Sequence, residues 1–164
     1  MALALTLALV ACATPSLPRG PSATQTPGLA LNDVDAEPIE RPVAGIAMAF
    51  DAAAAAELVV AVPDDLDFAS QALVCVYLGE RPTASWRLDL DSATLSGGEL
   101  RIDARENTPR GGAGELRVTF PADCALLNRA GLPAGQLTVS AHDTLSDEFI
   151  VGGTVVVPDA ASAP

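Results

Sequence analysis

The sequence has no lysine, one histidine and few aromatic residues, and each shortage excludes a class of function. All nine basic residues are arginines, against 21 acidic residues, so the 164-residue chain carries a net charge of −12. Because such a chain repels phosphate, we expect no nucleic-acid partner and no docking on anionic lipid through a basic patch. The absence of lysine excludes Schiff-base and serine–lysine mechanisms, and a single histidine argues against a zinc site. Aromatic residues make up only 4%, which argues against the sugar-binding cleft of a paired-carboxylate glycosidase.

The first twelve residues are apolar and end at a cysteine. The run from Met1 to Val10 reads MALALTLALV, which is too short to span a bilayer but suits the apolar region of a signal peptide. It ends in Leu9-Val10-Ala11-Cys12. This motif resembles the lipobox of bacterial lipoproteins, although the basic residues that usually precede the apolar run are absent.

The lipobox resemblance implies that residues 1–11 are a cleaved signal peptide and that the Cys12 thiol carries a diacylglycerol. Ala13 follows the lipidated position, and lipoproteins without aspartate there usually go to the outer membrane of bacteria that have two membranes. We therefore expect a cell-envelope protein attached to the lipid bilayer through acylated Cys12. The alternative is an ordinary signal peptide, or a buried apolar segment with an incidental cysteine.

Residues 12–42, which begin with the lipidated cysteine, predict a disordered tether. Six of the 13 prolines fall here, among serine, threonine, glycine and acidic residues, and no apolar periodicity is present. The alternative is that this segment wraps the domain as an irregular first strand. Residues 43–158 then form the predicted domain, and residues 159–164 a disordered tail.

Alternation of apolar and polar residues predicts an all-β domain. Residues 86–91 and 100–105 alternate on either side of Ser96-Gly97-Gly98, which is typical of a hairpin, with Trp86 among its inward residues. Further alternating strands are expected at 116–120, 137–141 and 155–157, and strands covered on both faces at 58–62 and 72–78. Seven or eight short antiparallel strands at this spacing indicate a β-sandwich. For residues 52–56 we expect strand–loop–strand rather than the helical turn that alanine also favours.

Residues 131–143 read GLPAGQLTVSAHD and resemble the penultimate strand of bacterial immunoglobulin-like modules. In those modules a Leu-Pro-x-Gly turn leads into an alternating strand that ends near an aspartate. They often have tyrosine at the position of Leu137, so the corner hydrogen bond of that tyrosine is absent here. The resemblance implies an immunoglobulin-like β-sandwich and implies nothing about function.

Two cysteines, Cys75 and Cys124, remain when Cys12 is lipidated. An even remainder in an exported protein predicts one disulfide. We place Cys75 inside a strand that is covered on both faces, and Cys124 in a turn or short helix after a strand that ends at Phe120. The alternative is two separately buried thiols.

Two groups of side chains are candidates for a site. Asp64, Asp65 and Asp67 lie in a predicted loop and offer the oxygen ligands that Ca²⁺ prefers. His142, followed by Asp143, points outward by alternation, but no Gly-x-Ser-x-Gly nucleophile motif accompanies it. We therefore expect no catalytic residues and no cofactor, and a β-sandwich that binds or braces another envelope protein. A Ca²⁺ or small-ligand module is the first alternative, and a small hydrolase using His142 the second.

Overall fold

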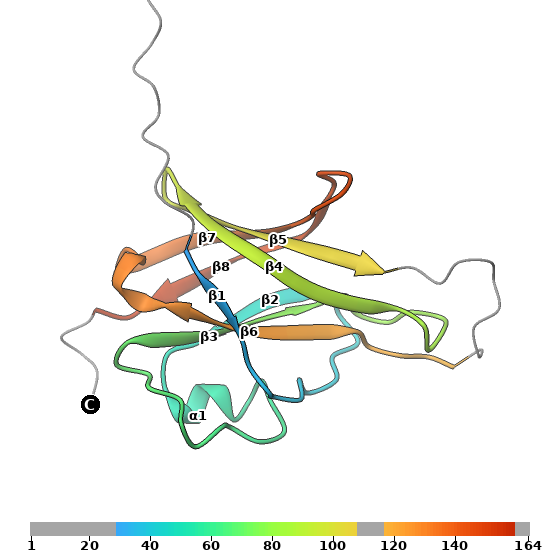
Figure 1. Cartoon of the computed structure of the whole chain (residues 1–164), viewed down its shortest axis with the longest axis horizontal. Coiled ribbons are helices and arrows are strands. Elements are labelled where there is room, and N and C mark those ends of the chain that lie inside the picture. Colours follow the sequence, from blue (N-terminus) through green and yellow to red (C-terminus); the bar gives the residue numbers. More distant parts are fainter. Residues whose placement is uncertain (1–28, 108–116, 160–164) are drawn as a thin grey trace, which may run out of the picture.

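Eight strands form two four-stranded sheets that pack face to face (Figure 1). The computed structural model describes residues 29–107 and 117–159. The first sheet has the order β1-β6-β3-β2 and the second the order β4-β5-β7-β8. The elements are β1 (Leu31–Asp33), β2 (Gly45–Ala49), α1 (Ala52–Ala55), β3 (Gln71–Tyr77), β4 (Arg87–Ser96), β5 (Glu99–Asn107), β6 (Ala122–Asn128), η1 (Arg129–Gly131), β7 (Gly135–Asp143) and β8 (Phe149–Val157). The all-β sandwich predicted from alternation is confirmed.

One strand pair departs from the expected antiparallel pattern. β5 and β7 run parallel, with Leu100 opposite Val139 and Ile102 opposite Ala141, whereas the other named pairs are antiparallel. A parallel pair needs a long crossover. Here the chain leaves the second sheet after β5, forms β6 in the first sheet and returns as β7. Alternation identifies a strand but carries no information about the direction of its neighbour, which is why the sequence missed this pair.

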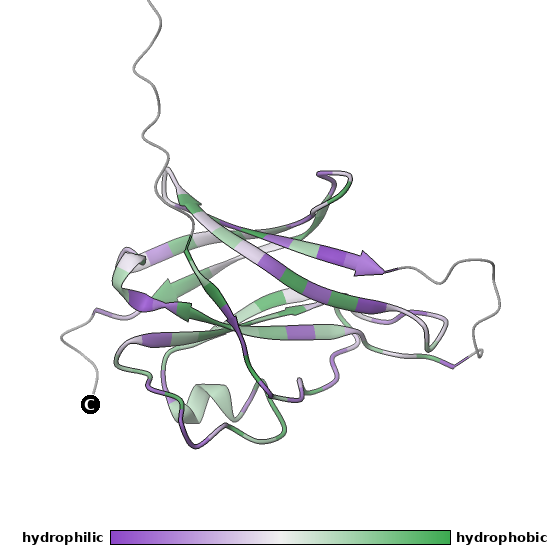
Figure 2. Ribbon diagram, viewed as in Figure 1, coloured by the Kyte–Doolittle hydropathy of each residue, from purple (hydrophilic) through white to green (hydrophobic). Residues whose placement is uncertain are grey.

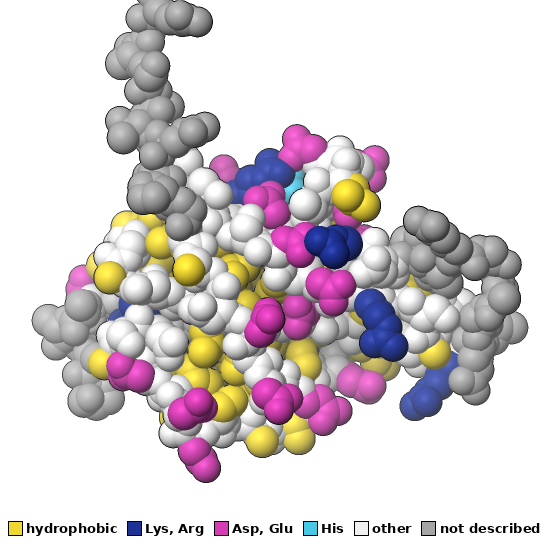
Figure 3. Space-filling view, in the orientation of Figure 1, with side chains coloured by type: hydrophobic (Ala, Val, Ile, Leu, Met, Phe, Trp, Pro, Cys, Tyr) yellow, Lys and Arg dark blue, Asp and Glu magenta, His cyan; other side chains and the backbone are white. Residues whose placement is uncertain are grey.

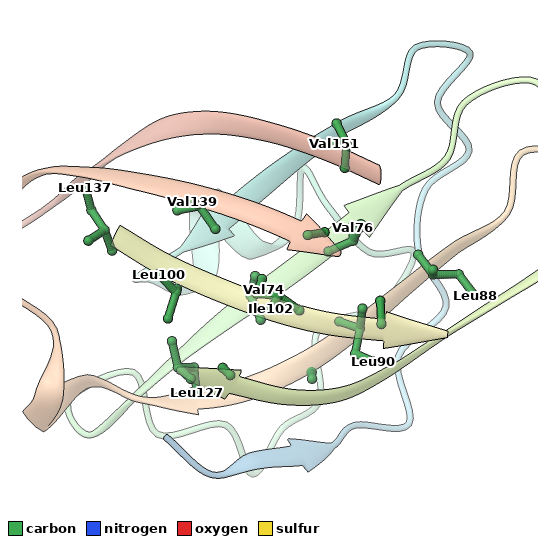
Figure 4. Packing of buried hydrophobic residues seen from close by; sticks show 14 of the residues in the cluster. Val74, Val76, Leu88, Leu90, Leu100, Ile102, Leu127, Leu137, Val139 and Val151 are labelled. Carbon is green, nitrogen blue, oxygen red and sulfur yellow. The ribbon is translucent and has the colours of Figure 1, made fainter. Parts of the chain in front are cut away.

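The main core lies between the two sheets (Figure 4). Every second residue of β3, β5 and β7 points into it, and each of the following is fully buried: Val74, Val76, Leu100, Ile102, Leu137 and Val139. β4 adds Leu88 and Leu90. The inward residues predicted for the hairpin strands and for 137–141 are therefore confirmed, except Trp86.

The β4–β5 hairpin has the predicted glycine turn and one bulge. Gly97 and Gly98 both have positive φ, 61° and 84°, which the type I′ turn of a tight hairpin requires. The register shifts between Leu90 and Ser92, so the buried positions pass from Leu90 to Ala93 and Asp91 is turned outward. Figure 2 shows the resulting polar and apolar bands along β4.

A covering layer buries the outer face of the first sheet. β3 has Leu73, Cys75 and Tyr77 on this face, all at most 1% exposed. They pack with Leu58 and Val59 beneath the layer that contains α1 (Figure 1). The prediction that residues 72–78 form a strand covered on both faces is confirmed.

Two predictions for the covering layer are wrong, the strand–loop–strand expected around residues 52–56 and the strand expected at 58–62. Residues 52–55 make one helical turn, because Asp51 caps it by accepting a hydrogen bond from the Ala54 amide at 2.7 Å and alanine favours helix. Residues 58–62 form no strand either, and Val59 makes only an isolated bridge to Pro38. Leu58 and Val59 are buried by packing against β3, which a sequence pattern cannot distinguish from burial inside a sheet, whereas Val60 is 67% exposed.

The strand predicted at 116–120 is also wrong. Leu116 lies outside the described residues, Val118 is 52% exposed, and Thr119 makes only an isolated bridge to Arg81. Pro121 lacks the amide that a ladder needs and restricts the residue before it. The strand begins after this proline, as β6.

The domain begins earlier than the sequence indicated. The Leu29 amide donates a 2.8 Å hydrogen bond to the Ala93 carbonyl, and β1 pairs with β6. From Leu29 onward the expected tether is therefore part of the sandwich, as the alternative of an irregular first strand proposed. The signal peptide, Cys12, the tether as far as residue 28 and tail residues 160–164 lie outside the described residues.

Candidate functional site

The two cysteines of the domain form the predicted disulfide. Cys75 on β3 and Cys124 on β6 are directly opposite in the antiparallel register, with their Cα atoms 4.1 Å apart. The expected position of Cys124 in a turn or helix is corrected, because it lies within a strand. Both residues are buried beneath the covering layer, so this bond joins two central strands of one sheet.

The aspartates proposed for Ca²⁺ have another role in the structure. Asp67 accepts hydrogen bonds from the Ser70 hydroxyl at 2.6 Å and the Ala69 amide at 3.1 Å. These bonds, that of Ser70 first, hold the pKa of the Asp67 carboxyl below its usual value. Asp64 and Asp65 are exposed. Over residues 29–107 and 117–159, no three His, Cys, Asp or Glu residues are grouped to hold a metal ion. Asp67 instead closes the turn before β3.

Within residues 29–107 and 117–159, His142 forms no hydrogen bond with a serine, threonine or cysteine side chain. Its ring lies edge to face against Phe149, with the centroids 5.7 Å apart, and its Nδ1 is 3.5 Å from the Asp147 carbonyl oxygen. The neighbouring Asp143 carboxylate accepts hydrogen bonds from the Ser146 amide and hydroxyl, which lower the pKa of Asp143. Asp143 thus closes the turn between β7 and β8, and the arrangement gives the hydrolase alternative no support.

Charged side chains pair across the outer face of the second sheet. Arg101 lies between Asp103, at 2.8 Å, and Asp147, and these two bonds raise the pKa of Arg101. Arg105 donates to both carboxylate oxygens of Asp91 at 3.0 Å. Figure 3 shows arginines beside acidic side chains on this part of the surface. The pair of Arg105 with Asp91 joins β5 to β4, whereas Arg101 and Asp103 lie on the same strand.

An open recess at one end of the sandwich contains the tryptophan. Trp86 was expected to face the core as part of a strand, but it precedes β4 and is only half-buried. The Arg81 guanidinium lies over its ring at 5.1 Å and also contacts Glu106 at 3.4 Å. The recess has a volume of about 470 Å³, and its lining is Arg81, Trp86, Glu106, Asp143, Ser146, Glu148, Phe149 and Ile150. Alternation predicted the wrong environment for Trp86 because the strand begins one residue later.

The recess opens beside β8, an edge strand that the sequence did not identify as a site. Phe149 at its start is 63% exposed and Val156 near its end is 73% exposed. The strand reads FIVGGTVVV and has no charged side chain. A run of nine uncharged residues in a chain of net charge −12 could have marked this segment as a candidate binding surface. Only the pairing of the strands shows that β8 lies at an edge of its sheet. We take this edge and the recess together as the candidate site.

No family model, curated protein or solved structure matches the chain. Along the described ranges, no helix is long and apolar enough to cross a membrane. The functional interpretation therefore depends on the chain's own residues and their arrangement.

Proposed function

We propose that the protein is an exported lipoprotein, acylated at Cys12 and anchored to the outer membrane, whose sandwich binds another envelope protein without catalysis. The disulfide between Cys75 and Cys124 is the observation that carries this proposal. Such bonds persist in the periplasm and outside the cell, and they are rare in the cytosol. The lipobox at Leu9–Cys12 independently points to the same compartment.

The position of the chain's entry supports a binding role for the far end of the sandwich. Leu29 lies against η1, because a Cβ on Gly131 would meet the Leu29 side chain at 2.6 Å. Seventeen residue steps separate Cys12 from Leu29, which span at most about 60 Å. The turn between β7 and β8 is at the other end of the molecule (Figure 1), and this turn supplies part of the lining of the recess. An anchor that enters at one end of the domain therefore leaves the recess at the opposite end open to a partner.

Metabolic labelling with an alkyne fatty acid in a bacterial host that has two membranes tests the anchor. The wild-type chain is expected to take up the label and to fractionate with the outer membrane, while Cys12→Ser loses both properties. A chain with Cys75→Ser and Cys124→Ser is the matched control, because it changes two cysteines and keeps the lipobox. Label that persists in Cys12→Ser, or a wild-type chain with free thiols in the cytosol, would contradict the proposal.

Site-specific photo-crosslinking in the same cells tests the binding role. A photoreactive amino acid at Phe149 is expected to give one discrete adduct with an envelope protein. The control position is Glu57, which is exposed in the covering layer far from β8. Equal adduct patterns from both positions, or no adduct at Phe149, would contradict a specific binding role for the candidate site.

A further inference from the structure

We propose that the outer edge of β8 binds an extended segment of a partner protein, which adds to the second sheet as a further strand and carries arginine or lysine on either side of an uncharged middle. This inference rests on the proposed function, since it specifies the chemistry of the envelope partner. Addition of a strand to an open edge is a common mode of peptide recognition, in which main-chain hydrogen bonds supply affinity.

The two edges of the second sheet differ in what covers them. On β4, the Leu90 amide donates to the Asp123 carboxylate at 2.8 Å, and the Ala93 carbonyl accepts from Leu29 at 2.8 Å. Arg87 and Asp89 add charge to the same strand. Charges and covering segments are the usual protection of an edge against pairing. The β4 edge is therefore closed by its own chain.

Within the described residues, the β8 edge has no charged side chain and no segment hydrogen-bonded to it on the side away from β7. Its ladder joins it to β7, and no main-chain hydrogen bond is formed by its other edge to a described residue. No residue from Phe149 to Val157 is charged. β2 lies close to β8, but its ladder is with β3 and no main-chain hydrogen bond joins it to β8. Nine residues at about 3.4 Å each offer an edge of about 30 Å to an incoming strand.

The middle of β8 is suited to the close approach of another backbone. Gly152 and Gly153 are adjacent and exposed, and glycine within a strand often marks a place where a second chain comes near. A Cβ on Gly153 would meet nothing within 4 Å, whereas one on Gly152 would meet the Phe149 ring at 3.1 Å. The Phe149 ring thus lies over Gly152, and an incoming strand would cover this ring and Val156.

The charges around β8 favour a basic partner over a second copy of the chain. Exposed Glu148 precedes the strand and exposed Asp159 follows it, and neither carboxylate has an ion-pair partner among the described residues. In an antiparallel pair of two β8 strands, the acidic start of one would face the acidic end of the other. A partner with a basic residue at each end would instead face a carboxylate at each end, Glu148 before the strand and Asp159 after it.

A pair of peptides distinguishes these possibilities. One probe is acetyl-Arg-Thr-Val-Thr-Val-Thr-Val-Thr-Val-Thr-Val-Arg-amide, whose arginines are eleven residue steps apart, as Glu148 and Asp159 are, and the other has glutamate in place of both arginines. Each carries a fluorophore, and its anisotropy is measured with the full acylated chain in neutral detergent. We expect the arginine probe to bind in the micromolar range, because the contact is at the small end of specific interfaces, and the glutamate probe to bind at least tenfold more weakly.

Reversal of the charges that flank β8 tests whether Glu148 and Asp159 contact the arginines of the probe. The variant with Glu148→Lys and Asp159→Lys is expected to weaken the arginine probe five- to tenfold and to strengthen the glutamate probe. The matched control has Glu57→Lys and Asp65→Lys in the covering layer, and it should leave both affinities unchanged. Equal loss in the control would show that only net charge matters and would overturn the proposal.

Hydrogen exchange locates the bound probe. The arginine probe should slow exchange of β8 amides at least fivefold and leave β4 amides unchanged. Slowing at β4, no binding of either probe, or a dimer of the chain that Val156→Lys dissociates would each overturn the proposal. Acylation and probe binding are measured on the same protein, so an unlabelled chain that binds the probe would contradict the anchor alone, and a labelled chain that does not bind would contradict this site alone.

Discussion

The two sheets of this sandwich bury their strands in different ways. In the first sheet, β3 has the core on one face and the covering layer on the other, and six of its seven residues are fully buried. In the second sheet, β4 and β5 bury only one face, and their other face carries paired arginines and aspartates. The first sheet also contains the disulfide.

This difference indicates where the stability of the fold lies. Burial of one large apolar side chain contributes about 1.5–3 kcal/mol, whereas an exposed ion pair contributes about 0–1 kcal/mol. We therefore expect changes in the first sheet to lower the free energy of unfolding strongly and changes on the outer face of the second sheet to have little effect. The outer face and the β8 edge are correspondingly free to serve binding.

Loss of the disulfide should have the largest effect. Cys75 and Cys124 are 49 residues apart, and a crosslink of this length stabilises a fold by about 4 kcal/mol through the entropy of the unfolded chain. The variant with Cys75→Ala and Cys124→Ala should lose about this amount in urea unfolding. Wild-type protein unfolded with a reductant is the control and should approach the variant. A loss below about 1 kcal/mol would show that the disulfide does not make the first sheet more stable than the second.

Asp123 links the two sheets, and its removal should have the next largest effect. Its carboxylate on β6 accepts hydrogen bonds from the Leu90 amide of β4 and from the Cys124 amide at 2.9 Å. Asp123→Ala leaves a partly buried amide without its acceptor, at a cost of about 1–3 kcal/mol. Urea unfolding at neutral pH measures this cost, and Asp89→Ala on the outer face is the control. Equal costs for the two variants would show that the link between the sheets is unimportant.

The same residue predicts a pH dependence. Burial raises the pKa of Asp123 above its usual 3.8, so the fold binds this proton more tightly than the unfolded chain does. The contribution of Asp123 to stability should therefore fall as the pH rises from below 3.8 through the raised pKa. Asp123→Asn cannot titrate and should flatten this part of the stability profile. A wild-type profile that falls with increasing acidity over the same interval, and that Asp123→Asn leaves unchanged, would contradict this assignment.

Tyr77 tests the covering layer with a smaller expected effect. Its buried hydroxyl donates a 3.2 Å hydrogen bond to the Leu58 carbonyl, and burial raises the pKa of Tyr77 while the nearby Arg41 opposes the rise. Tyr77→Phe should cost about 0.5–1.5 kcal/mol, the usual contribution of one hydrogen bond. Urea unfolding gives the value, and ultraviolet titration should show the wild-type tyrosine ionising above pH 10. No change in stability would mean that apolar packing alone holds the layer.

Arg101 should show the smallest effect. It pairs with Asp103 and Asp147 on the exposed face, so Arg101→Gln should cost less than about 1 kcal/mol and less still at high salt. Urea unfolding at low and high salt measures both expectations, with Arg105→Gln as a companion at the neighbouring pair with Asp91. A cost above 2 kcal/mol at either position would show that the charged face stabilises the fold as strongly as the buried sheet does.

The alternating strands at 86–91, 100–105 and 137–141 and the doubly covered strand at 72–78 were found from the sequence, whereas the strands predicted at 116–120 and 58–62 are absent. Residues 137–141 lie in β7, and the hairpin around Gly97 was placed correctly, because each has a local pattern and a local turn. Residues 58–62 are as apolar as β3, but only Leu58 and Val59 are buried, through packing against β3 and outside any strand ladder.

Part of the candidate site was also within reach of the sequence. An uncharged run of nine residues is visible from Phe149 to Val157, and the number of cysteines predicted one disulfide. Neither observation predicts that β8 is an edge strand or that Trp86 lies in a recess with Arg81. These properties depend on which strands are neighbours and on where a strand begins, and neither is encoded in a short window of residues.

The sequence by itself determined the class of fold, the inward residues of the regular strands and the pairing of two cysteines. Side chains of a strand alternate with a period of two, so burial of one face makes every second residue apolar, and this pattern can be read from the sequence. Only the tertiary structure decided that β5 and β7 are parallel, that Cys124 lies opposite Cys75 in a neighbouring strand, and that β4 is covered while β8 is open. These features are set by contacts between segments far apart in the chain. The hydrophobic effect stabilises such contacts whatever their separation in the sequence, so no short window of residues predicts them.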